Sequence, residues 1–98
     1  MAWLPIRYRD FYDVPRMFVV ELPRAVYFFD GRFDDAADEY PQAYRVYQLP
    51  PGRAADEPRS WDGLERLGHL VAEVPVPSVL FDPSRRAAVD DAVLQALG

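Results

Sequence analysis

Apolar and polar residues alternate along several short stretches in the first half of the chain, which is the pattern of half-buried β-strands. These stretches are residues 4–8, 17–22, 25–30 and 44–49. Residues 25–30 carry apolar side chains on both faces, which favours a central position in a sheet. Only Pro23 and Arg24 separate this stretch from the one before it, so the two are expected to pair as a hairpin.

Turn signals divide these stretches. Residues 13–16 (Asp-Val-Pro-Arg) are expected to turn the chain, because proline fixes φ and lacks an N–H donor. The Asp-Gly pair at residues 30–31 is a second turn signal. Residues 33–39 then favour a short helix that ends before Pro41, since the residue preceding a proline avoids the α region.

Chain breakers and a first helix signal open the second half of the sequence. A polar stretch rich in proline covers residues 50–59, and we expect it to be a flexible loop. Ser60 is a suitable cap for a short helix near 60–67, and Gly68 would end that helix.

The last third of the chain predicts an edge strand followed by a helix. Residues 70–81 are extended in pattern, and their two prolines, two positions apart, remove N–H groups from the same side of the strand, as at a sheet edge. Asp82 at an N-cap and Pro83 at the first helical position predict a C-terminal helix near 83–97.

These elements predict a single α+β domain over residues 1–98. The sheet is expected to be mostly antiparallel with four to five strands, and the C-terminal helix should pack on one of its faces. A sheet rolled toward a small barrel is the alternative. The expected core residues are Ile6, Phe18, Val20, Val26, Phe28, Val46, Leu64, Val79, Val93 and Leu97.

Composition narrows the class of protein. The 98 residues carry 11 basic against 16 acidic side chains, a formal net charge of −5, which disfavours binding to nucleic acid or to anionic membranes. No apolar run approaches the ~20 residues of a membrane span, and the first residues lack the pattern of a signal peptide. We therefore expect a cytoplasmic protein. The absence of Lys and Asn beside abundant Ala, Arg and Pro indicates a GC-rich, bacterial genome.

The densest acidic run, residues 30–39, is the first candidate site. On a helix its carboxylates would form like-charge pairs, each destabilising by about 0.2–0.5 kcal/mol. A run of carboxylates that keeps such repulsion could serve to bind a basic protein partner or a hard cation. The alternative is that the run is simply a solvent-exposed acidic surface. Gly31 directly follows Asp30, which departs from calcium-loop spacing, and we expect neither metal nor cofactor. The candidate partner-binding acids are Asp34, Asp35, Asp38 and Glu39.

A second candidate site mixes arginine with aromatic residues over residues 7–16. Both Arg and Tyr are enriched at protein interfaces and in hot spots. Stacking on single-stranded nucleic acid would use the same residue types, but the net charge and the interspersed Asp10 and Asp13 disfavour it. Alternatively, Tyr8 and Phe11 are core residues and the arginines pair locally. The candidate contacts are Arg7, Arg9, Tyr12 and Arg16.

Signatures of catalysis are few. His69 is the only histidine, and no serine lies in a nucleophile-elbow sequence. The absence of cysteine excludes disulfides and thiolate sites. The chain also has no glycine-rich phosphate-binding motif.

Three functional hypotheses follow. The first is a small acidic bacterial interaction or regulatory protein that binds a partner protein with a basic surface and has no catalytic activity of its own. The second is a small-molecule-binding protein or simple enzyme with an aromatic pocket, lined by Tyr27, Phe29, Tyr44 and Tyr47. The third is a structural subunit of a larger assembly.

Overall fold

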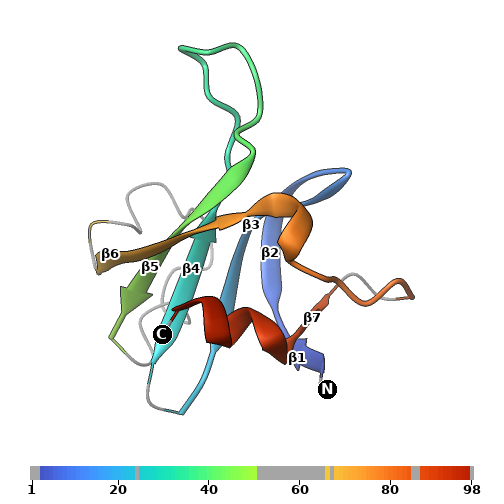
Figure 1. Cartoon of the computed structure of the whole chain (residues 1–98), viewed down its shortest axis with the longest axis vertical. Coiled ribbons are helices and arrows are strands. Elements are labelled where there is room, and N and C mark those ends of the chain that lie inside the picture. The colour runs from blue at the N-terminus through green and yellow to red at the C-terminus, as the bar shows by residue number, and fades with distance from the viewer. Residues whose placement is uncertain (1–2, 24, 51–65, 67, 85–86, 98) are drawn as a thin grey trace.

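The computed structural model describes residues 3–23, 25–50, 66, 68–84 and 87–97. Its main element is an antiparallel sheet in the order β2-β3-β4-β5-β6, in which each strand pairs with the next one along the chain (Figure 1). The strands are β2 (Arg7–Tyr12), β3 (Val14–Glu21), β4 (Val26–Asp30), β5 (Ala43–Leu49) and β6 (His69–Pro75). The predicted antiparallel sheet, including the β3–β4 hairpin, is therefore confirmed.

A second sheet pairs β1 (Trp3–Pro5) with β7 (Ala88–Asp90), joining the two ends of the described chain. Ile6 separates β1 from β2, and its N–H donates to the carbonyl oxygen of Ala87 at 2.9 Å. The single strand expected at residues 4–8 is thus split, because its first part pairs with the C-terminal region and its second part with β3.

Both faces of the central strands are buried, as the alternation of residues 25–30 predicts. The larger cluster contains Ile6, Phe18, Val20, Phe29, Tyr44, Val46, Val74, Val79, Val89 and Val93. The smaller cluster contains Met17, Val19, Val26, Phe28 and Leu49. Of the ten expected core residues, Leu97 is half-buried at the rim and Leu64 lies outside the described residues; the other eight are buried.

The C-terminal region differs from the helix predicted over residues 83–97. Its residues Ala88–Asp90 form β7, with β1 on one side and a bridge from Phe81 to Val89 on the other. Of the described residues in this range, only Asp91–Leu97 are helical, as the 3-10 helix η4, which crosses one face of the sheet (Figure 1). Val89 has no exposed surface, so burial between two strands outweighs the local helix signal.

The two capping aspartates of this region also show that the helix starts later than predicted. Asp82, the expected helix cap, accepts the N–H of Ser84 at 2.8 Å and so caps a turn. Asp90 accepts the N–H of Ala92 at 3.0 Å, where η4 begins. Helical structure therefore starts later than the Asp-Pro signal predicts.

The strand predicted over residues 70–81 does form an edge of the sheet, as β6. It ends at Pro75, however, and the short 3-10 helix η3 (Val76–Ser78) follows. In the part of the chain that the structure describes, β2 and β6 are separate edges, and no barrel is closed.

Residues 51–65 and 67 lie outside the described residues. The short helix near 60–67 and the flexible loop at 50–59 therefore stay predictions. Across the described ranges, none of the helices has the length and apolar character that a membrane crossing requires.

Candidate binding groove at the base of an acidic hairpin

The acidic run forms a hairpin, here called the acidic hairpin (residues 31–42), which leads from β4 to β5 and projects beyond the sheet (Figure 1). Asp34 and Glu39 form an antiparallel bridge, with N–H···O distances of 2.8 and 3.3 Å. The carboxylate of Asp34 accepts the N–H groups of Ala36 and Ala37, at 3.0 and 3.2 Å. The short helix expected at 33–39 is absent because this side chain caps a turn instead, a local competition typical of aspartate.

The acidic hairpin keeps its carboxylates in solvent. All four candidate acids, Asp34, Asp35, Asp38 and Glu39, are exposed. No group of three or more potential metal ligands occurs within the described residues. The hairpin therefore presents a solvated negative surface in which only Asp34 has a capping role.

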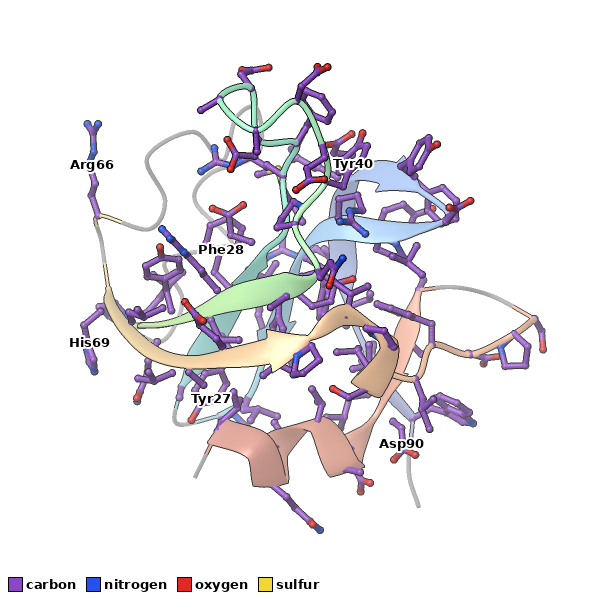
Figure 2. The ribbon with its side chains drawn as sticks, turned by 45° about the horizontal axis from the view of Figure 1, so that its top comes forward. Tyr27, Phe28, Tyr40, Arg66, His69 and Asp90 are labelled. Carbon is purple, nitrogen blue, oxygen red and sulfur yellow. The ribbon has the colours of Figure 1, made fainter. Side chains whose placement is uncertain are left out.

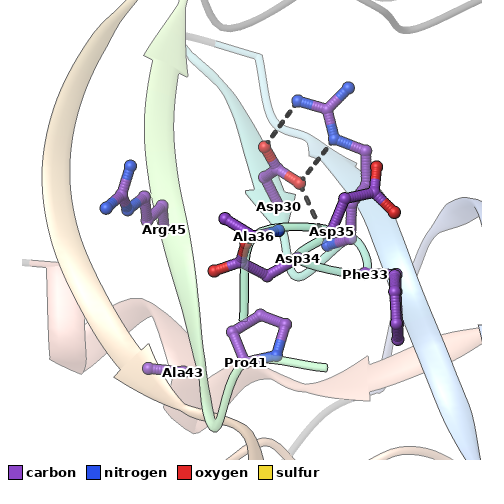
Figure 3. Close-up of a pocket in the computed structure, with 9 residues that line it drawn as sticks. Asp30, Phe33, Asp34, Asp35, Ala36, Pro41, Ala43 and Arg45 are labelled. Carbon is purple, nitrogen blue, oxygen red and sulfur yellow. Dashed lines mark hydrogen bonds and ion pairs between the residues drawn. The ribbon is translucent and has the colours of Figure 1, made fainter. Parts of the chain in front are cut away.

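One side of the acidic hairpin borders a pocket of about 460 Å³ (Figure 3). In it, the Arg32 side chain binds Asp30 with two hydrogen bonds, from Nε at 3.0 Å and from Nη2 at 2.9 Å, and the Arg32 backbone N–H donates a third at 3.2 Å. Arg45, across the pocket, lies 3.9 Å from Glu73 on the neighbouring strand. Both arginines that line this pocket have carboxylate partners, so neither offers an unmatched positive charge to a ligand.

Arg16 ties the two ends of the acidic hairpin to the sheet. Its Nε donates to the carbonyl oxygen of Gly31 at 3.1 Å, and its Nη2 donates to that of Pro41 at 2.8 Å. In return, the N–H of Gly31 donates to the backbone oxygen of Arg16 at 2.6 Å. Arg16 belongs to β3, because the turn expected over residues 13–16 is confined to Asp13, whose φ is 65°.

One aromatic ring packs on the guanidinium, and two others pack on that ring. Arg16 lies 4.5 Å from the centre of the Tyr40 ring, within the range of a cation–π contact. Tyr12 stacks on the same ring at 4.8 Å with 15° between the planes. Phe33 meets it edge-on at 5.1 Å. Tyr40 thus joins the β2–β3 turn to the acidic hairpin.

Tyr12, Arg16 and Tyr40 form one wall of a groove of about 420 Å³, here called the proline groove. The opposite wall is the end of β6 with η3, held to the hairpin by a 2.8 Å hydrogen bond from Val76 N–H to the Gln42 carbonyl oxygen. The proline groove is lined by Tyr12, Arg16, Tyr40, Pro41, Gln42, Pro75, Val76 and Pro77.

The charge of Arg16 is the unusual feature of this groove. The side chain is only 6% exposed, and its hydrogen bonds end on two backbone carbonyl oxygens. Among the described residues, no carboxylate forms an ion pair with it. Arginine is seldom so buried without a counter-charge, because desolvating an unpaired charge is costly.

Tyr44 lies behind this cluster and supports it. Its hydroxyl donates to the Pro15 carbonyl oxygen at 2.7 Å, and its ring is completely buried. Burial raises the pKa of the Tyr44 phenol, while the positive charge of Arg16 opposes that rise. Tyr44 therefore stays protonated and serves as a structural donor.

The structure brings some of the sequence-predicted residues together and separates others. Tyr12 and Arg16 meet at the proline groove, next to the hairpin that carries the candidate acids. Arg7 lies at the other end of β2, where it pairs with Glu21, and Arg9 is half-buried on the same strand. Arg7 and Arg9 thus lie outside the groove lining.

Sequence reasoning missed the other lining residues. The sequence pattern marks Tyr40 and Pro41 only as the end of a helix, and it marks the prolines of residues 70–81 only as signs of an edge strand. The Arg-Tyr-Pro composition of these segments was visible, but their proximity depends on strand pairing that links residues 12, 40 and 75.

The alternative aromatic pocket is not assembled. Phe29 and Tyr44 have no exposed surface within the larger core cluster. Tyr47 packs with the smaller cluster instead, across from Phe28, and Tyr27 packs at the margin of the larger one. These four rings therefore do not line one cavity.

His69 lies far from the proline groove. It begins the edge strand β6, where its side chain is exposed, on the side of the molecule away from Tyr40 (Figure 2).

Comparison with known proteins found no family model, no curated protein and no solved structure that matches this chain.

Proposed function

We propose that this protein is a non-catalytic binding protein whose acidic hairpin and proline groove together form the interface for a partner protein. The observation that carries the proposal is Arg16, buried beneath Tyr40 without a carboxylate partner among the described residues. A partner that supplies the missing counter-charge would turn a costly buried cation into a favourable contact.

The residue types of the groove support this interface. Arg and Tyr dominate binding hot spots, because they combine large contact area with directed polar groups. Tyr12 is 57% exposed, although its ring is stacked on Tyr40. The groove therefore presents rings that are already held in place, which lowers the entropy lost on binding.

The acidic hairpin adds charge to the same surface. Its exposed carboxylates lie on a projecting segment whose ends are tied down by Arg16. Carboxylates of this kind attract a basic partner and accelerate its association, and salt weakens that attraction. The proposed partner therefore has basic residues facing the hairpin.

A pull-down from the native host, at low and at moderate salt, tests this function. The variant Asp35→Asn/Glu39→Gln removes two hairpin charges and keeps the Asp34 cap. The variant Glu21→Gln/Asp91→Asn is the matched control, because it removes two carboxylates at the end of β3 and on η4, outside both the hairpin and the groove lining. Recovery of the partner should fall for the hairpin variant and persist for the control. Equal recovery with both variants would count against the interface.

A small-molecule-binding function is the second candidate. The proline groove, at about 420 Å³, falls within the roughly 300–1,000 Å³ of typical ligand pockets. A host that yields no partner protein at either salt concentration, together with a small ligand that shifts the melting temperature, would favour this candidate.

A further inference from the structure

The donors of the proline groove are few. Pro41, Pro75 and Pro77 contribute no N–H groups, so the groove walls offer ring surfaces and little else. The polar side chains that line the groove are Arg16, Gln42 and the two tyrosines. Arg16 is the one charged residue among them, so a ligand would be held by one charged anchor and by apolar contact along the walls.

The anchor favours an anion, because a guanidinium carries a positive charge. Two of the five guanidinium N–H groups of Arg16 are used by the carbonyl oxygens of Gly31 and Pro41. Arg16 itself lines the groove, and a carboxylate that reaches its remaining donors would form charge-assisted hydrogen bonds. The exposed acids of the adjoining hairpin repel every anion, and they repel a dianion about twice as strongly as a monoanion.

We propose that the proline groove binds an extended, proline-containing segment of the partner protein, with one acidic side chain of that segment on Arg16. This proposal rests on the proposed function, since it names the part of the partner that enters the groove. Grooves lined by aromatic rings suit proline-rich segments, which are pre-organised in an extended conformation and lose little entropy on binding. Basic residues elsewhere in the partner offset the repulsion from the acidic hairpin.

Two blocked tripeptides test the proposal: N-acetyl-Pro-Glu-Pro-amide and its matched control with Gln in place of Glu. Each is titrated into the isotope-labelled protein, and the Nε–H resonance of Arg16 is followed by NMR. The Glu peptide should shift this resonance saturably, and the Gln peptide should bind about tenfold more weakly, the usual effect of a charged hydrogen bond. An unmoved Arg16 resonance, or equal binding of both peptides, would overturn the proposal.

Substitutions provide a second readout. Because Arg16→Lys would disturb the hairpin itself, the informative variant is Gln42→Glu, which places a competing carboxylate in the groove on an exposed side chain. The matched control is Gln95→Glu, an exposed position on η4. Gln42→Glu should weaken the Glu peptide about tenfold, and Gln95→Glu should leave it unchanged. Wild-type binding by Gln42→Glu contradicts the proposal.

The last experiment titrates the labelled protein with inorganic phosphate at equal ionic strength. A phosphate-induced shift of the Arg16 resonance as large as that from the Glu peptide would show a general anion site and overturn the carboxylate assignment. If the tripeptides fail while the host pull-down still depends on the hairpin charges, then the interface stands and only this occupant is wrong.

Discussion

The guanidinium of Arg16 lies 4.5 Å from the centre of the Tyr40 ring, and the same side chain donates to a backbone carbonyl at each end of the acidic hairpin. One buried arginine thus fixes a projecting segment to the sheet and forms part of a groove. Stability and recognition are coupled through this residue, and substitutions at it and around it distinguish the two effects.

Replacing Arg16 with Ala should lower the free energy of unfolding by about 2–4 kcal/mol, because a buried carbonyl oxygen (Gly31) and a part-buried one (Pro41) lose a charged donor. Urea denaturation measures this change. Arg45→Ala is the control, since the Arg45 side chain is 67% exposed and should stay within about 0.5 kcal/mol of wild type. A similar effect from both substitutions would show that Arg16 does not anchor the hairpin.

Gly31→Ala should also destabilise the protein. A Cβ atom at this position would lie 3.0 Å from Cδ1 of Tyr44 and 3.1 Å from the backbone oxygen of Arg16. Because the Tyr44 ring is completely buried, it has little room to move, and overpacking of this kind costs about 1–3 kcal/mol. Thermal unfolding gives the shift, and an unchanged melting temperature would mean that the strand ends are looser than the contacts indicate.

Tyr44 should make stability depend on alkaline pH. Burial raises its pKa, so the folded protein keeps the phenol proton above about pH 10, where an unfolded tyrosine loses it. The unfolded state then binds fewer protons, and the free energy of unfolding falls as pH rises. Denaturation of wild type and Tyr44→Phe on both sides of about pH 10 tests this. The variant should be less stable at neutral pH, through loss of the bond to Pro15, and less sensitive to alkali.

The turn of the acidic hairpin should depend on Asp34 and not on its neighbour. Asp34→Ala removes the acceptor for the N–H groups of Ala36 and Ala37, so their amide exchange should accelerate. Asp34→Asn keeps an acceptor oxygen and should preserve protection, and Asp35→Ala should have little effect. Unaltered exchange in Asp34→Ala would show that the turn holds without this cap.

The central strands were predictable because the hydrophobic pattern that marks them lies within a few consecutive residues. Residues 25–30 have two apolar faces, and β4 indeed has neighbours on both sides. The edge position of β6 agrees with the prediction from Pro75 and Pro77, although Pro77 lies in η3, beyond the end of the strand. In these elements the local pattern and the tertiary environment favour the same structure.

The wrong helix predictions share a physical cause. In each case another interaction competes with the helix, and the local sequence pattern does not show that interaction. Val89 lies on an apolar helical stripe, but pairing with β1 on one side and Phe81 on the other places it in a strand. Asp34 complements a helix start, but its side chain caps a turn. The groove was invisible for a related reason, because its residues come from three segments far apart in the sequence.

The most direct test of the proposed interface is an amide-exchange footprint of the protein with the partner captured from its host. The proposed interface predicts new protection at Tyr12, Tyr40 and Gln42 and at the turn of the acidic hairpin, with no change in η4. Protection confined to η4 or to β6 near His69, with the groove and the hairpin unaffected, would contradict it.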